Sequence, residues 1–212
     1  MPISDGSGNK GHGFSRRSFL RGSAITTAEA SVIDVASAIL GQAEAAESGG
    51  LSVAGPEPVP ITLRVNGATH ALQIEPRMTL AEALRGPLGL TGTKIACNRG
   101  ACSACTVWLD GETVCSCMML AIEVGARSVT TIEGLATGGQ LHPVQTAFIE
   151  HDALQCGFCT PGMVMSCAAL LERTPHPTAE GVQAAISGHA CRCGAYPHVI
   201  AATLAAAKAR KA

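Results

Sequence analysis

The chain has 212 residues, of which 47% are hydrophobic and 15% charged, and its formal net charge is -1 at pH 7. This length and apolar content allow one large domain or two small ones, each with a real core, and exclude a chain that is mostly disordered. The near-zero charge argues against nucleic acid as a partner. Ten cysteines in a chain of this length favour metal ligation over a disulfide scaffold, because secreted disulfide scaffolds are usually short.

The N-terminal residues carry the pattern of an export signal. The stretch "SRRSFLR" at residues 15–21 resembles the twin-arginine signal and follows a short polar leader. The apolar segment 23–45 contains two acidic residues and is too polar for a stable membrane span. We therefore expect a twin-arginine signal and leader over residues 1–50, followed by a Pro/Gly-rich linker over residues 51–60.

Residues 61–135 predict a small mixed sheet packed on one helix. Apolar residues alternate from Ile61 to Val65, Asn66-Gly67 supplies a hairpin turn, and residues 71–75 form the returning strand. Thr79 then caps a short helix, with Glu82 three residues on in the position of a capping box, and Gly86-Pro87 should end it.

A second hairpin follows the first cysteines. Residues 106–109 and 113–115 flank Asp110-Gly111, which is a hairpin turn signal, and residues 128–132 have the composition of a last strand. These strands complete the predicted sheet.

From residue 140 to residue 212 the apolar pattern becomes helical. Four segments start at His142-Pro143, Thr160-Pro161, Thr178 and Ala195, and together they predict a bundle of four short helices. A Gly-rich link joins the two halves, so the sequence predicts two domains of an α+β protein.

The first group of cysteines lies in the sheet half. Cys97, Cys102 and Cys105 have the spacing of a plant-type 2Fe-2S ferredoxin, whose fourth cysteine lies further along the chain. The small residues between them allow one loop to wrap around a cluster. Cys115 and Cys117 both qualify as the fourth ligand, since residues two apart share one face of an extended strand.

The second group of cysteines lies in the helical half and consists of Cys156, Cys159, Cys191 and Cys193. Residues two apart on a helix point to nearly opposite sides, so we expect Cys191 and Cys193 in a loop. Cys159 precedes a helix start, where the positive end of the helix should favour the thiolate. Four thiolates in this spacing suit either a 2Fe-2S cluster or zinc.

The sequence does not indicate that Cys167 or any histidine is a metal ligand. Cys167 falls in an apolar helix and is expected to be a buried small hydrophobe. The seven histidines have the pattern of surface or capping residues.

Five stretches in order resemble the iron-sulfur subunit or domain of the molybdenum hydroxylases, the family of xanthine dehydrogenase and aldehyde oxidoreductase. They are "CNRGACSACTVWLDG", "TTIEGL", "LHPVQTAF", "QCGFCTPGM" and "ACRCGAYPHV". The resemblance covers the chain from about residue 60 to the C-terminus. It implies a plant-type ferredoxin-like beta-grasp domain followed by a four-helix-bundle domain, each with one 2Fe-2S cluster.

The resemblance also implies the ligands. In the first domain they are Cys97, Cys102, Cys105 and Cys117, and in the second Cys156, Cys159, Cys191 and Cys193. Gln155 and Cys193 are implied to contact the pterin cofactor of a large subunit. One departure is Ser103, where the family often has glycine, and a serine there is strained if the position needs positive φ.

The resemblance further implies an electron-transfer subunit with no catalytic residue of its own. It would relay electrons one at a time from molybdenum, on a molybdopterin-binding subunit, towards FAD on a third subunit or an external acceptor. An export route for folded protein suits clusters assembled in a reducing cytosol, so a periplasmic aldehyde oxidoreductase is expected.

Two other functions are compatible with the cysteine pattern alone. A stand-alone exported electron carrier should have a well-charged surface, whereas the mean hydropathy here is +0.27, which favours a subunit with large buried interfaces. A disulfide-stapled secreted module should be colourless and have no free thiol.

Overall fold

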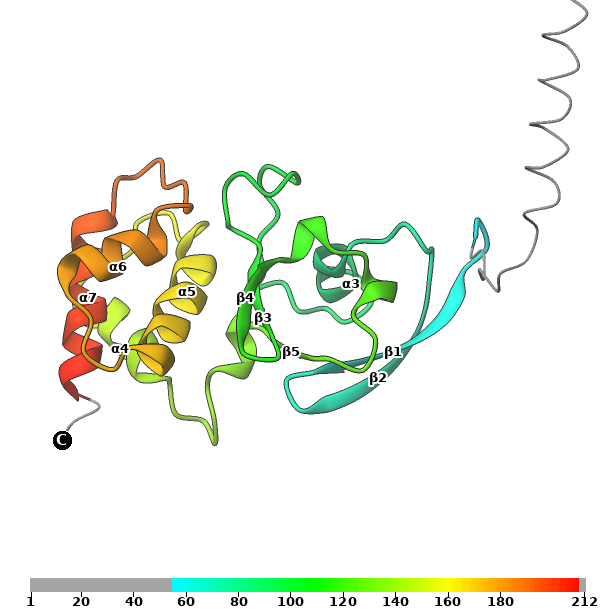
Figure 1. Cartoon of the computed structure of the whole chain (residues 1–212), viewed down its shortest axis with the longest axis horizontal. Helices are drawn as coiled ribbons and strands as arrows, with labels where there is room; N and C mark the ends of the chain where they lie inside the picture. Colours follow the sequence, from blue (N-terminus) through cyan, green and yellow to red (C-terminus); the bar gives the residue numbers. More distant parts are fainter. Residues whose placement is uncertain (1–54, 210–212) are drawn as a thin grey trace, which may run out of the picture. The chain divides into compact units, whose positions relative to one another are not determined.

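The computed structural model describes residues 55–209, so the predicted export signal and most of the predicted linker lie outside the described residues. Within this range the chain forms a five-stranded sheet with one helix, followed by four further helices (Figure 1). The predicted α+β class is confirmed. Among residues 55–209, no helix is both long enough and apolar enough to cross a bilayer.

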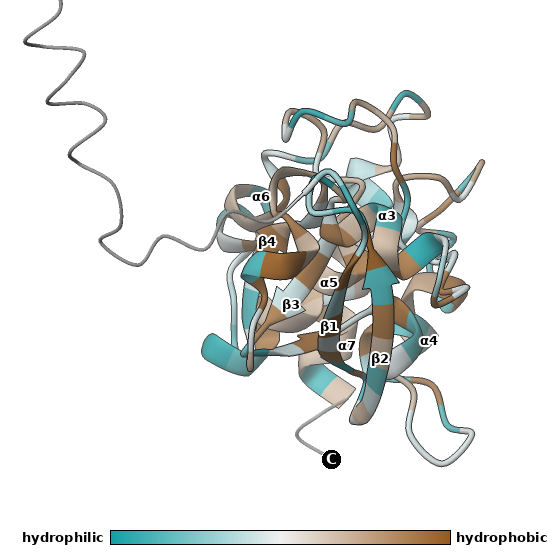
Figure 2. Cartoon of the chain, turned by 90° about the vertical axis from the view of Figure 1, so that its right-hand side faces the viewer, coloured by the Kyte–Doolittle hydropathy of each residue, from teal (hydrophilic) through white to brown (hydrophobic). Residues whose placement is uncertain are grey.

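The sheet begins with the predicted hairpin. Strands β1 (Val59–Val65) and β2 (Ala68–Ile74) pair antiparallel, and β1 begins two residues before the predicted boundary. The turn residues Asn66 and Gly67 have φ angles of 52° and 80°, which a tight hairpin of this type requires. Buried and exposed residues alternate along both strands, so one face packs on the core (Figure 2).

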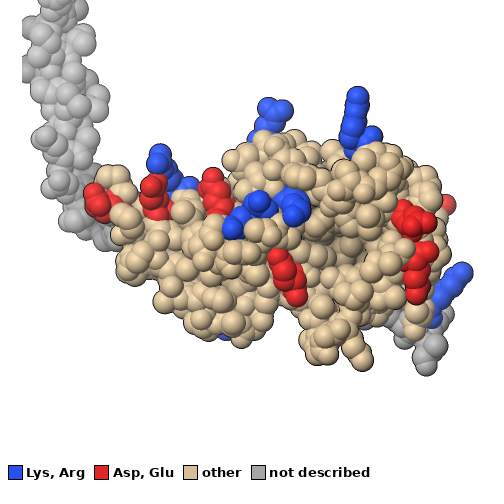
Figure 3. Space-filling model, turned by 180° about the vertical axis from the view of Figure 1, so that it is seen from behind, with Lys and Arg blue, Asp and Glu red and all other residues tan. Residues whose placement is uncertain are grey.

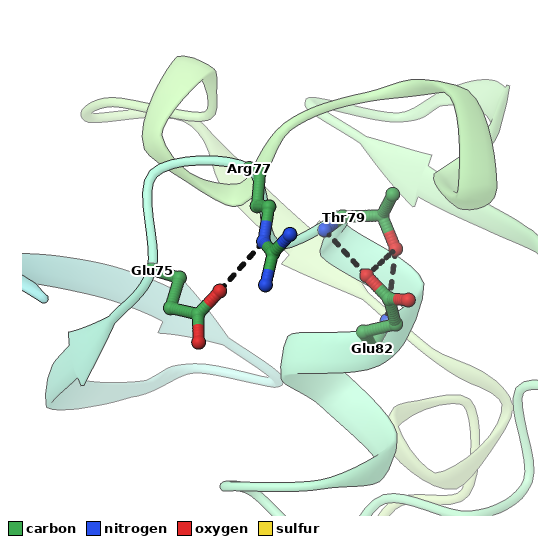
Figure 4. Close-up of polar contacts among 4 residues, drawn as sticks. All are labelled: Glu75, Arg77, Thr79 and Glu82. Atoms are coloured by element: carbon green, nitrogen blue, oxygen red, sulfur yellow. Dashed lines mark hydrogen bonds and ion pairs between the residues drawn. The ribbon is translucent and has the colours of Figure 1, made fainter. Parts of the chain in front are cut away.

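Helix α3 (Leu80–Arg85) has the predicted capping box. Thr79 Oγ1 accepts a hydrogen bond from the Glu82 amide at 3.3 Å, and Glu82 Oε2 accepts one from the Thr79 amide at 2.9 Å (Figure 4). This reciprocal bonding satisfies two amides that the first turn would otherwise leave unpaired. The nearby ion pair between Glu75 and Arg77 is largely exposed and adds little stability.

The second hairpin and the last strand complete the sheet. Strands β3 (Thr106–Leu109) and β4 (Glu112–Cys115) pair around the predicted turn, and β5 (Ser128–Thr130) lies between β1 and β3. Because β5 is parallel to β1 and antiparallel to β3, the sheet is mixed, as predicted. The last strand is shorter than predicted, since the Thr131 amide donates to Asn66 Oδ1 instead of continuing the ladder.

Short 3-10 turns connect these elements. They are η1 (Ser116–Met118), η2 (Ala121–Glu123) and η3 (Ile132–Gly134).

The four predicted helices are all present. They are α4 (Pro143–Glu150), α5 (Thr160–Arg173), α6 (Ala179–Ile186) and α7 (Tyr196–Ala209). Two of their starts have side-chain caps: His142 Nδ1 accepts from the Val144 amide, and Thr178 Oγ1 accepts from the Gly181 amide. These caps are the local signals from which the sequence predicted the starts of the two helices.

Two large apolar clusters form most of the interior. One lies between the sheet and α3 and includes Leu63, Leu84 and Val107, and the other lies among α4 to α7 and includes Phe148 and Met165. Trp108, the single tryptophan of the chain, packs against the helical cluster from strand β3. Its Nε1 donates a hydrogen bond to the Met165 carbonyl at 2.9 Å, which fixes the sheet against α5.

The backbone of the first cysteine loop lies directly on the first turn of α5. A Cβ atom placed on Gly162 would lie 2.5 Å from the Ser103 carbonyl oxygen and 3.2 Å from that of Ala104. Neither oxygen is the end of a flexible side chain, so only glycine permits this approach.

Replacing Gly162 by alanine should therefore separate the loop from the helix. We expect Gly162→Ala to lower the free energy of unfolding by roughly 1–3 kcal/mol, despite the better helix propensity of alanine. Gly181→Ala is the matched control, because a Cβ there meets nothing closer than 3.6 Å. Denaturant unfolding of both variants measures the difference, and equal stability of the two would contradict the proposed close contact.

Candidate metal centres

The first site is built on the loop between α3 and β3. Asn98, Gly100 and Ser103 have positive φ angles of 50°, 72° and 53°, so the loop turns back on itself several times. These turns direct backbone amides towards sulfur: the Ala101 amide donates to Cys97 Sγ and the Gly100 amide donates to Cys117 Sγ, each at 3.3 Å. Such hydrogen bonds stabilise the negative charge of a thiolate or of a cluster.

The cysteines of the first site meet in two pairs. Cys97 lies within hydrogen-bonding reach of Cys102, and Cys105 lies within reach of Cys117. The second pair is buried and packs against Ala81 of α3. Helix α3 therefore supports the inner side of the site.

Cys97 and Cys117, one thiol from each pair, have pKa values shifted in opposite directions. Hydrogen bonds from the Arg99 amide and from Cys102 lower the pKa of Cys97 to about 7. Burial raises the pKa of Cys117, and the neighbouring Cys105 adds to this rise. Cys97 thus favours the thiolate before any metal binds, and Cys117 does not.

The structure separates the two candidates for the fourth position, Cys115 and Cys117. The assumption that both lie in one extended strand is wrong, because β4 ends at Cys115 and η1 contains Cys117. The Sγ of Cys115 points to the Gly100 carbonyl at 4.0 Å, whereas Cys117 is the partner of Cys105. The change from strand to 3-10 turn brings Cys117 to the site.

Ser103 has a positive φ angle, which is the case in which a serine at this position was expected to be strained. Its φ angle of 53° lies in a region that glycine and asparagine adopt more readily than serine, so the backbone of Ser103 is strained. The Thr106 amide and hydroxyl both donate to the Ser103 carbonyl, at 3.2 and 2.7 Å. These bonds hold the strained turn.

The second site is built from two loops of the helical half, one before α5 and one between α6 and α7. Cys156 lies within hydrogen-bonding reach of Cys193, and Cys159 lies within reach of Cys191. Cys191 and Cys193 lie in the loop before α7, which confirms that they are outside helices. Cys159 is the residue that immediately precedes α5, also as expected.

The expected ionisation of Cys159 is wrong. Burial and the neighbouring Cys191 raise the pKa of Cys159 to about 12, so the thiol is neutral before any metal binds. By contrast, hydrogen bonds from the Phe158 amide and from Cys193 lower the pKa of the exposed Cys156. As in the first site, one pair faces solvent and the other faces the interior.

The loop before α7 is held by residues that the sequence did not single out. His189 is 5% exposed, so the expectation that all histidines lie at the surface or in caps is wrong. Its Nε2 and Ser166 Oγ form a hydrogen bond of 2.7 Å, and burial lowers the pKa of His189 to about 4. The Tyr196 hydroxyl bonds the backbone of the same loop. Only Tyr196, within one of the motifs, carried a signal in the sequence.

The two residues that were predicted to contact a pterin cofactor, Gln155 and Cys193, are accessible to solvent. Gln155 is exposed and Cys193 is half-buried, both beside the second site. Their apolar neighbours Leu154 and Phe158 are 40% and 47% exposed. This edge of the second site is open to a partner molecule.

The pairing of the thiols suits a cluster of two metal ions in each site. A tetrahedral zinc site needs four ligands around one point, whereas a 2Fe-2S cluster divides its four thiolates between two irons. The thiol pairs match the second arrangement, and all ten cysteines are free. The eight-ligand assignment itself stays a prediction.

Cys167 lies away from both sites, on α5 in the helical core. It is fully buried, and this burial raises the pKa of Cys167 to about 11. The thiol therefore fills space as a neutral apolar group, as expected.

Comparison with known proteins agrees with a protein of two iron-sulfur domains. Residues 63–129 match the family model "2Fe-2S iron-sulfur cluster binding domain", and residues 131–204 match "[2Fe-2S] binding domain". Together the two matches cover nearly all of the described range.

Curated relatives and a solved structure identify the family. The chain is 43% identical over 162 residues to the aldehyde oxidoreductase iron-sulfur-binding subunit PaoA of Escherichia coli O157:H7, covering 69% of this chain and 71% of that one. It is 47% identical over 146 residues to the nicotine 6-hydroxylase small subunit of Paenarthrobacter nicotinovorans, covering 69% and 88%. Quinoline 2-oxidoreductase from Pseudomonas putida 86 matches with a TM-score of 0.70 at 41% identity, covering 73% of this chain and 97% of that chain. The chain belongs to the iron-sulfur subunits of the molybdenum hydroxylases.

Replacing Cys167 and Cys159 separately should distinguish a core thiol from a ligand. We expect Cys167→Ala to keep full iron content and to lose about 1 kcal/mol of stability, as for a small cavity. Cys159→Ala should lose about half of the iron, because one of two clusters cannot assemble. Iron analysis and denaturant unfolding give the two results. Iron loss in Cys167→Ala comparable to that in Cys159→Ala would show that Cys167 is a ligand.

Proposed function

We propose that this chain is the electron-transfer subunit of an exported molybdenum hydroxylase that oxidises aldehydes to carboxylic acids. The observation that carries the electron-transfer role is the meeting of the two thiol sites. The Ala190 amide, next to Cys191 of the second site, donates a hydrogen bond to the Cys102 carbonyl of the first site at 3.2 Å. The orange loop before α7 and the green loop before β3 can be followed in Figure 1.

The residues of the chain prepare both sites for this role. Amides at residues 100 and 101 donate to sulfur, and burial of Cys105 and Cys117 limits the access of water. When bound, a 2Fe-2S cluster accepts and passes on one electron at a time, at a potential set by such hydrogen bonds and by solvent access. The chain supplies no catalytic residue in this proposal.

The proposed partners are a large molybdopterin-binding subunit and an FAD-binding subunit. The open, apolar edge of the second site, with Leu154 and Phe158, supports contact with the large subunit, and Gln155 and Cys193 would face its pterin. Met118, which is 64% exposed beside the first site, marks a second apolar surface. The face shown in Figure 3 has scattered charges of both signs and wide uncharged areas, which suits burial against other subunits.

The aldehyde substrate is proposed from relatedness. PaoA and the aldehyde oxidoreductase from Desulfovibrio desulfuricans, at a TM-score of 0.68 and 41% identity, support it, although the chain spans only 17% of the latter. Other relatives are named for nicotine and nicotinate, so an N-heterocyclic substrate is the competing outcome.

Purification of the tagged full chain with its associated subunits tests the subunit role. We expect about four irons per chain, two distinct 2Fe-2S signals in electron paramagnetic resonance, and molybdenum and flavin in the same fraction. The complex should oxidise an aldehyde faster than nicotinate. A chain recovered alone, with iron and without molybdenum, would instead be a stand-alone electron carrier.

Export by the twin-arginine route, and hence a periplasmic location, is also proposed from residues 15–21. We expect the double variant Arg16→Lys with Arg17→Lys to remain in the cytoplasm with its clusters, because lysine does not replace this arginine pair. Arg21→Lys, outside the pair, is the control and should be exported. Fractionation with immunodetection measures the distribution, and export of both variants would refute the proposed route.

A further inference from the structure

Three successive residues of the second site, His189 to Cys191, are fastened to three different parts of the chain. The His189 side chain bonds Ser166 of α5 at 2.7 Å. The Ala190 amide bonds the Cys102 carbonyl of the first cysteine loop at 3.2 Å. The Cys191 amide donates to the Tyr196 hydroxyl of α7 at 2.8 Å.

The Tyr196 hydroxyl is the group that closes this arrangement. It accepts from the Cys191 amide and donates to the His189 carbonyl at 2.9 Å, so it bonds both sides of Ala190. The ring is half-buried against the helical core, which fixes the position of the hydroxyl. The Ala190 amide, which contacts the first site, is therefore held between two bonds to a single rigid side chain.

We propose that Tyr196 is a positioning residue that holds Cys191 in the second site and keeps Ala190 in contact with Cys102 of the first. This inference rests on the proposed function, since it takes Cys191 as a ligand. Without the hydroxyl, the Cys191 amide and the His189 carbonyl lose their partners, and the segment is free to admit water or to turn its amide towards sulfur. Both changes stabilise the more negative, reduced form of a bound cluster.

The variant Tyr196→Phe removes the hydroxyl and keeps the ring, and it is tested in the purified, iron-loaded complex. We expect the amides of residues 190 and 191 to exchange hydrogen about tenfold faster, the effect of losing one hydrogen bond of roughly 1.4 kcal/mol. Redox titration followed by electron paramagnetic resonance should show a higher midpoint potential for one centre and an unchanged value for the other.

Thr203→Val is the matched control. It also removes a buried hydroxyl from α7, but that hydroxyl donates to the Val199 carbonyl within the same helix. We expect it to leave both potentials and the exchange of residues 190 and 191 unchanged. Ser166→Ala loosens the same segment from α5 and should change potential and exchange in the direction of Tyr196→Phe.

The possible results separate this inference from the proposed function. A wild-type complex with only one 2Fe-2S signal would refute the two-cluster function itself. Two wild-type signals, with Tyr196→Phe and Ser166→Ala both behaving like Thr203→Val, would refute the positioning role alone. If Tyr196→Phe does not fold, Ser166→Ala takes its place. A changed potential and faster exchange in Ser166→Ala support the positioning role, and values equal to those of Thr203→Val refute it.

Discussion

The arrangement of this subunit depends on a close approach of backbone to backbone. The first cysteine loop touches α5 at a glycine, Gly162, and touches the loop before α7 through one hydrogen bond, from Ala190 to Cys102. No side chain needs to intervene at either contact. Because Cys102 takes part in the bond and Cys191 follows the donor, the spacing of the two thiol sites is set by main-chain geometry.

Each site has an outer and an inner pair of thiols. The difference in burial couples metal binding to the release of protons. The pKa of Cys97 is lowered to about 7 by hydrogen bonds, whereas burial raises that of Cys159 to about 12. A thiol with such a raised pKa is protonated at neutral pH and releases its proton only when a metal ion replaces it. Cys159 therefore needs the metal to ionise, whereas Cys97 is already close to the thiolate state.

The surface of the chain suits a component of a larger assembly. Exposed apolar side chains lie beside both sites, Met118 at the first and Phe158 at the second, where an electron donor or acceptor must approach. The ion pair of Glu112 on β4 with Arg173 on α5 is exposed and adds little to stability. Trp108 and Gly162 hold the halves together from inside, which leaves the outer surface available for partners.

The sequence by itself determined the two domains, the hairpin turns, the capped helix starts and the spacing of the cysteines, because these depend on neighbours within a few residues. It left Cys115 and Cys117 equivalent, misjudged the ionisation of Cys159 and gave no sign of Ser166 and His189. Those features depend on the end of β4, on burial, and on a bond between residues 23 positions apart. Only the tertiary structure decided them, since pairing and desolvation are set by segments that meet in space and leave no local pattern.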